Sequence, residues 1–191
     1  MKVKKGDAGY ICSRKRLVII KTALLFGIVI ALLILGIVQT GDRMNLLTVV
    51  AILGCLPASK SLVEVIMFLP HHSISAENAQ EIEQKTKRLT KAFDMIFTSE
   101  KKIMPVESIV ISDNTICGYT SNPKVDTNFA GEHIKKYLVA NQFTKVSVKI
   151  FDNYATFLNR VEGMNNIINV DKNDVREKEE AIRQVILSLS L

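Results

Sequence analysis

The sequence predicts a two-helix transmembrane hairpin followed by a small α/β (α+β) soluble domain with a three- to four-stranded sheet flanked by helices. Two observations predict the hairpin: residues 17–70 are overwhelmingly apolar, and a short polar turn divides them into two runs. The third observation concerns residues 71–191. Their alternating and helical hydrophobic patterns are typical of a soluble domain that is large enough to bury a core.

The first apolar run extends from Leu17 to Val38, and Lys21 is its only charged residue. These 22 residues would span about 33 Å as a helix, which matches a hydrocarbon core of about 30 Å. A cleaved signal peptide has a shorter apolar region of about 7–15 residues and ends in a small-x-small site. We therefore interpret residues 17–38 as a membrane anchor.

The second apolar run covers residues 45–69 and is interrupted by Ser59-Lys60-Ser61 and Glu64. It is long enough to span a bilayer only if it continues through Glu64. Lys60 would then lie near the far interface, where its stem can carry the charge to the head groups. Pro57 predicts a kink. A re-entrant or interfacial segment is the alternative.

The positive charge of the chain is concentrated before the first apolar run. Residues 1–16 contain Lys2, Lys4, Lys5, Arg14, Lys15 and Arg16, whereas the turn between the runs contains only Arg43. The positive-inside rule therefore predicts a multi-pass protein of the cell membrane, such as a bacterial inner membrane, with residues 1–16 and 71–191 in the cytoplasm. Residues 71–191 carry 16 basic and 16 acidic side chains, so we expect no nucleic acid partner.

Two charged residues inside the apolar runs predict an ion pair. In a hairpin centred at residue 41 or 42, Lys21 lies level with residue 62, within one helical turn of Glu64. Lys60 is a competing partner because it precedes Glu64 by four residues. The remaining alternative is that each side chain extends separately into the head groups.

Small residues four positions apart predict how the two helices pack. They are Gly27 and Ala31 in the first helix and Gly54 and Ala58 in the second. Small side chains at one height allow two backbones to approach closely in lipid. We therefore expect these four residues at the helix–helix contact.

The soluble part has a readable order of elements. The patterns predict helix, three strands, helix, strand, helix and helix, at residues 76–93, 95–97, 108–111, 115–119, 129–141, 146–150, 152–163 and from Asp171 or Asn173 to Leu189. Asp113-Asn114 predicts a tight hairpin turn.

This αβββαβ start resembles the core order of the restriction-endonuclease-like fold, which includes nuclease-related domains, some of them tethered to membranes. The resemblance covers about 75 residues. The family binds a divalent metal with a carboxylate before or on the second strand and an acidic-x-Lys pair on the third. The third predicted strand, Thr115–Tyr119, has no such pair. The resemblance therefore implies a fold and gives no reason to expect catalysis.

Residues that usually carry chemistry form no recognisable site. Phosphate-binding loops and nucleophile motifs are missing from the sequence, and the cysteines and histidines lack metal-ligand spacing: Cys12, Cys55, Cys117, His71, His72 and His133. We predict no catalytic, metal or cofactor site and expect a non-enzymatic, membrane-anchored protein. Its cytoplasmic domain would bind the lipid bilayer surface, a protein partner or a second copy of the chain. The alternative is a membrane-tethered hydrolase with a degenerate restriction-endonuclease-like core.

Overall fold

The computed structural model describes residues 3–41, 45–99, 102–167 and 173–191. The chain forms two compact units. One consists of Ile11–His71, and the other combines Met1–Tyr10 with His72–Leu191. The first ten residues therefore belong to the same unit as the C-terminal domain, although the hairpin separates them from it in sequence.

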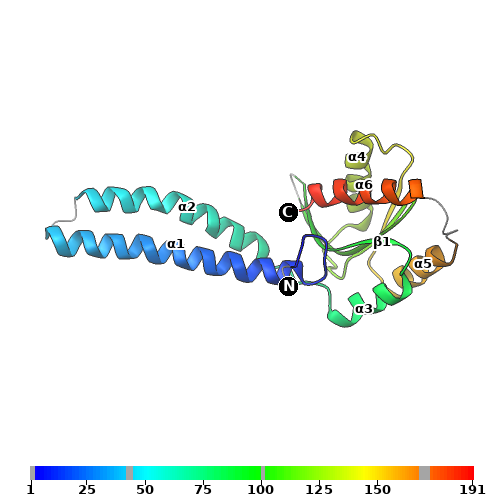
Figure 1. The fold of residues 1–191 in the computed structure, drawn as a ribbon, viewed down its shortest axis with the longest axis horizontal. Coiled ribbons are helices and arrows are strands. Elements are labelled where there is room, and N and C mark those ends of the chain that lie inside the picture. The colour runs from blue at the N-terminus through cyan, green and yellow to red at the C-terminus, as the bar shows by residue number, and fades with distance from the viewer. Residues whose placement is uncertain (1–2, 42–44, 100–101, 168–172) are drawn as a thin grey trace. The chain divides into compact units, whose positions relative to one another are not determined.

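The hairpin unit consists of α1 (Tyr10–Thr40) and α2 (Leu46–Phe68), the two long helices in Figure 1. Both are long and apolar enough to cross a membrane, with mean hydropathies of 2.8 and 1.9. α1 begins at Tyr10, seven residues before the predicted start at Leu17. Arg and Lys are good helix formers, so the helix extends through the basic segment. Pro57 lies inside a continuous α2, and the Asn45 side chain caps its first turn by accepting the Thr48 N–H at 2.8 Å. Asp42 and Arg43 of the predicted turn lie outside the described residues.

The register of the hairpin follows from contacts between the two helices. The hydroxyl groups of Thr22 and Ser61 are buried and 2.7 Å apart. Deeper in the hairpin, a Cβ on Gly54 would lie 3.1 Å from Val29. Both pairs are symmetric about a point between residues 41 and 42, the centre that the sequence predicts. Buried positions recur mainly at intervals of three, four or seven, as in antiparallel coiled coils: Val18, Thr22 and Val29 on α1, and Ala51, Ala58, Ser61 and Phe68 on α2.

The domain contains a four-stranded mixed sheet with helices on both faces (Figure 1). Its elements are α3 (Ala76–Lys85), β1 (Thr90–Thr98), β2 (Ile103–Ser112), β3 (Thr115–Tyr119), α4 (Thr127–Ala140), β4 (Ser147–Phe151), α5 (Tyr154–Ile167) and α6 (Asn173–Leu189). The strands lie in the order β1-β2-β3-β4. Neighbours are antiparallel except for β3 and β4, which α4 joins as a parallel pair. Two long apolar helices followed by an α/β domain agree with the predicted fold class.

Each face of the sheet has its own hydrophobic core. Ile134 of α4 and Ile182 of α6 belong to one core, while Ile82 of α3 and Phe157 of α5 belong to the other. Gly118 in β3 is required by the first core, since a Cβ there would lie 2.6 Å from the Ile150 side chain. The sheet is therefore the middle layer of three.

Several predicted elements have different bounds: β1 and β2 are longer than predicted, α5 continues past Gly163 to Ile167, and the first helix of the domain is shorter. The helix predicted at residues 76–93 ends at Lys85, and Leu89 and Phe93 belong to a turn and to β1. The spacing of these apolar residues fits a helix, but eight residue pairs between β1 and β2 outweigh that local preference. The two-residue turn at Asp113-Asn114 is confirmed, with Asp113 at a φ of 48°. The predicted cap residue Asp171 lies outside the described residues.

The two ends of the chain cover the outer edge of β1. The Phe93 N–H donates to the Gly6 carbonyl at 2.8 Å, and the Leu191 N–H donates to the Ile96 carbonyl at 2.9 Å. Lys5 fastens the two ends to each other, because its ammonium group donates to the Ser190 carbonyl at 2.6 Å. Residues 3–9 are thus part of the domain.

Gly6 and Gly9 offer a matched test of this arrangement, because both have positive φ, at 94° and 85°. A Cβ on Gly6 would lie 3.0 Å from Arg183 and Leu187, whereas a Cβ on Gly9 would meet nothing within 4 Å. Both substitutions by alanine cost about 1–2 kcal/mol of backbone strain, but only Gly6→Ala also displaces its neighbours. We expect the Phe93 amide to exchange with solvent about five times faster in Gly6→Ala than in Gly9→Ala, as measured by amide hydrogen exchange. Equal rates would show that residues 3–9 do not hold the β1 edge.

Candidate functional site

The second edge of the sheet is formed by β4. The Ser147 N–H donates to the Asn114 carbonyl at 2.8 Å, and the Phe151 carbonyl accepts the Thr120 N–H at 3.0 Å. In a parallel ladder, main-chain groups of alternate residues point to the same side. The N–H and C=O groups of Val148 and Ile150 therefore point away from β3, along the edge of the sheet.

A groove of about 490 Å³ runs along this edge. Residues 148–152 form one wall, and the first half of α4 forms the other, together with Thr156 of α5. Asp126 fixes the start of α4 because its carboxylate accepts the N–H groups of Asn128 and Phe129. Gly131 then lets the helix approach the strand, since a Cβ there would lie 3.4 Å from the Val148 carbonyl oxygen.

The groove offers main-chain pairing together with charges of both signs. Glu132 and Lys135 line it from α4, and Lys149 and Asp152 line it from the strand side. The Lys149 ammonium group lies 5.2 Å from the centre of the Phe151 ring, which holds the lysine stem against an aromatic surface. Such a groove can accept an extended polypeptide, with hydrogen bonds to the strand edge and ion pairs on either side.

A second cavity, also about 490 Å³, lies between residues 3–8, α3, β1 and α6. Its basic side chains already have protein partners. The Lys91 ammonium donates to the Thr86 carbonyl at 3.0 Å, and the Arg183 guanidinium contacts the Lys91 carbonyl and Glu180. Burial lowers the pKa of Lys91, and the charge of Glu83 opposes that shift. The hydrogen bond from Arg183 to the Lys91 carbonyl holds α6 against β1.

Two tyrosines and an acidic residue form a polar cluster between α3 and α5. The Tyr154 hydroxyl donates to Glu81 at 2.9 Å, and its ring lies edge-on to Tyr119 with centroids 5.3 Å apart. Burial, followed by the hydrogen bond and charge of Glu81, raises the pKa of Tyr154. Burial, followed by the charge of Glu107, also raises the pKa of Tyr119. Both phenols therefore remain neutral and serve as hydrogen-bonding and packing groups.

Of the two strands that carry metal ligands in a nuclease-like core, β2 has a carboxylate here and β3 has none. β3 presents Cys117, whose thiol contacts the Met164 sulfur at 3.4 Å and whose pKa is raised by burial. On β2, the Glu107 carboxylate accepts hydrogen bonds from the Ser121 main chain and hydroxyl. Within the described residues there is no group of three or more His, Cys, Asp or Glu side chains that could hold a metal ion.

His71 and His72 are adjacent in sequence, and the three histidines are not among the residues that line the groove. His71 belongs to the end of the hairpin unit and His72 to the start of the domain. His133, on α4, stacks on the Phe129 ring with centroids 6.3 Å apart.

The charged residues of the hairpin have a different pairing from the expected one. Glu64 forms an ion pair with Arg14, at 2.9 Å. Lys21 and Lys60 are exposed, and the ion pairs in the described part of the chain do not include one between either lysine and Glu64. Arg14 precedes Lys21 by two helical turns and is on the same face of α1. Its long side chain reaches Glu64 from there.

The small residues predicted at the helix contact are divided between two environments. Gly54 and Ala58 face α1, and Ala58 is fully buried. Gly27 and Ala31 are exposed, and a Cβ on Gly27 would meet nothing within 4 Å. The reason is helical phase: Gly27 lies two residues before the interface residue Val29, which turns it to the opposite side of α1.

No family model, curated protein or solved structure matches this chain. A functional interpretation therefore rests on the geometry described above. Two features stand out from the rest of the molecule: the groove along β4 in the domain and the charged face of the hairpin.

The Arg14–Glu64 pair can be separated from the alternative Lys21–Glu64 pair by double-mutant cycles. Both side chains of the observed pair are partly exposed, so its coupling energy should be about 0.2–1 kcal/mol. We expect Arg14→Gln with Glu64→Gln to give such a coupling, and Lys21→Met with Glu64→Gln to give none. Thermal unfolding of the full chain in nanodiscs supplies the measurement. Coupling in the lysine cycle alone would favour the Lys21–Glu64 pair.

Proposed function

We propose that this chain is an integral membrane protein whose cytoplasmic domain binds an extended segment of a protein partner along β4. In this proposal α1 and α2 are the anchor and β4 is the binding edge. The protein works by holding its partner at the membrane, without catalysis. The observation that carries the proposal is the outward-facing main chain of Val148 and Ile150 beside a groove.

Membrane anchoring is supported by the surface of the hairpin. Large aliphatic side chains are exposed along both helices, including Leu24, Val38, Leu46 and Leu56, each at least 60% exposed. Soluble monomers rarely carry so much contiguous apolar surface, whereas lipid makes it favourable. The basic residues before α1 favour a cytoplasmic N-terminus. Residues 3–10 pack in the same unit as residues 72–191, which supports a cytoplasmic domain as well.

Binding at β4 is supported by the contrast between the two sheet edges. The chain covers the β1 edge with its own ends, through Gly6 and Leu191. The β4 edge instead adjoins the groove, with charged side chains at its rim. Strand addition uses main-chain hydrogen bonds for affinity and flanking side chains for specificity, and this edge supplies both.

The topology can be tested with single cysteines in a variant whose three native cysteines are replaced by alanine. We expect Gln39→Cys to react with an impermeant thiol reagent on intact cells and Gln80→Cys to react only after the cells are opened. The basic N-terminus and the unit that residues 3–10 share with residue 80 both favour a cytoplasmic position for residue 80. Reaction of both cysteines in intact cells would contradict the hairpin topology.

The binding edge can be tested with Val148→Pro and Val148→Thr in the full chain in nanodiscs. Proline removes an outward-facing N–H and is tolerated at an edge position, whereas threonine keeps the N–H and the shape of valine. The probe is a displayed library of random linear peptides selected against the wild-type protein. We expect the selected peptides to bind Val148→Pro at least about tenfold more weakly, since each lost main-chain bond removes about 0.5–1.5 kcal/mol and the ring also blocks approach. Val148→Thr should bind as wild type does.

Lys149→Pro serves as the structural control, because its N–H points toward β3 and its loss should lower the melting temperature of the domain. Val148→Pro should melt close to wild type. Peptide binding that survives Val148→Pro in a folded protein would place the site elsewhere. Specific crosslinking of two copies through residue 148, without peptide selection, would replace the partner by a second copy of the chain.

A further inference from the structure

Two lysines of the hairpin lie within one helical turn of each other in height. The hydrogen bond between Thr22 and Ser61 fixes the level of the two helices at that point. Lys21 directly precedes Thr22, and Lys60 directly precedes Ser61. One residue changes the height by about 1.5 Å, and on antiparallel helices the two steps run in opposite directions. The two lysines therefore leave their helices about 3 Å apart in height, less than one helical turn.

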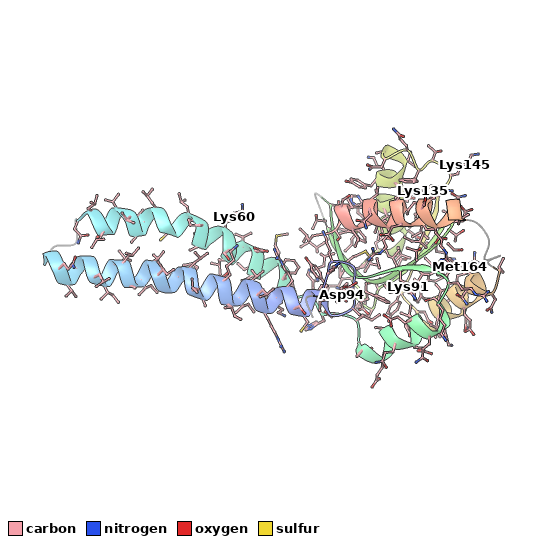
Figure 2. The ribbon with its side chains drawn as sticks, in the orientation of Figure 1. Lys60, Lys91, Asp94, Lys135, Lys145 and Met164 are labelled. Carbon is pink, nitrogen blue, oxygen red and sulfur yellow. The ribbon has the colours of Figure 1, made fainter. Side chains whose placement is uncertain are left out.

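The same two lysines lie on one face of the hairpin. Thr22 and Ser61 face each other, and the helices are antiparallel. One step back along each helix turns the side chain by about 100°, and the opposite directions of the helices bring both side chains to the same side. Lys21 and Lys60 are exposed, and Figure 2 shows Lys60 extending away from the α2 ribbon. Packed helices lie about 8–10 Å apart, a distance that two lysine stems can close around one group between them.

The charge on this face is not balanced by the protein. Arg14, two turns before Lys21, and Glu64, one turn after Lys60, belong to the same face. These two neutralise each other through their ion pair at 2.9 Å. Lys21 and Lys60 therefore leave two positive charges in the described part of this face.

The depth of the lysines matches a head-group boundary. Between Lys21 and Gly41, α1 has 19 residues without a charge. As a helix these residues span about 29 Å, close to the hydrocarbon thickness of about 30 Å. If the turn lies at one interface, the ammonium groups of Lys21 and Lys60 reach the phosphate layer of the other.

We propose that Lys21 and Lys60 together bind the phosphate of an anionic phospholipid. The site rests on the proposed membrane anchoring, and its ligand is a lipid with a net negative head group, such as phosphatidylglycerol. The two ammonium groups contact one phosphate from neighbouring helices. The bound lipid therefore bridges α1 and α2 next to the Thr22–Ser61 bond and stabilises the hairpin against separation of its helices.

The test uses the full chain in nanodiscs of phosphatidylcholine containing increasing amounts of phosphatidylglycerol, with native mass spectrometry to count retained lipids. The variant is Lys21→Gln with Lys60→Gln. Each lysine near an anionic surface contributes about a fivefold factor in affinity, so we expect retention of phosphatidylglycerol to weaken about 30-fold. Lys21→Arg with Lys60→Arg should retain it. The control, Arg16→Gln with Lys145→Gln, removes the same charge, because Arg16 points away from this face and Lys145 belongs to the domain (Figure 2).

Several results would overturn the site. One is an equal loss in the control, and another is an equal loss of phosphatidylcholine in the lysine variant. A third is displacement of the lipid by excess inorganic phosphate, which would indicate a site for a free anion instead. Resistance of the wild-type chain to alkaline carbonate extraction is measured first. Extraction would overturn the membrane anchoring and the site with it, whereas resistance with unchanged lipid binding in the variant would overturn the site alone.

Discussion

A single main-chain hydrogen bond, from the Phe93 N–H to the Gly6 carbonyl, constrains the rest of the molecule. It joins the edge of the sheet to a residue that precedes both hairpin helices. A single membrane crossing would place these two groups on opposite sides of a bilayer and break the edge. The helices therefore cross together or not at all. Both helices are long and apolar enough to cross a membrane, and aliphatic side chains are exposed along both of them.

The edges of the sheet explain how the domain divides its surface. An open sheet has two rows of outward-facing main-chain groups, and proteins normally cover or blunt them. Here two segments cover the outer edge of β1. The Leu191 N–H donates to the Ile96 carbonyl, and the Gly6 carbonyl accepts the Phe93 N–H. Lys149 at the β4 edge, with Lys145 just before the strand, is the type of charged residue that discourages uncontrolled strand pairing, so a partner at β4 needs complementary side chains as well as a free backbone.

Hydrophobic periodicity predicted most of the fold, because the residues that each helix or strand buries in a core recur at regular spacing. It failed at Leu89 and Phe93, whose spacing continues the apolar stripe of α3. Leu89 lies in the turn before β1, and Phe93 belongs to β1 because it pairs with Ser108 of β2. The hairpin shows the same limit. Spacing selected Gly27 and Ala31 as one face of α1, but the direction of that face depends on the phase set by Thr22 and Val29. No pattern in the sequence indicated the β4 groove, because the position of a strand at the sheet edge depends on strand order rather than on local sequence.

Three basic side chains of the hairpin compete for one carboxylate, and their separation in sequence does not decide which of them pairs with it. Lys21, Lys60 and Arg14 share one face of the hairpin with a single carboxylate, Glu64. A guanidinium makes directional bonds to a carboxylate and is more weakly hydrated than an ammonium group, so Arg14 has an advantage for Glu64 in spite of its distance along the helix. The lysines are strongly hydrated and flexible, which suits them to the phosphate layer rather than to a protein partner. The arrangement of four charges therefore divides the face into a neutral pair toward the domain end of the helices and a cationic pair where the charge-free length of α1 begins.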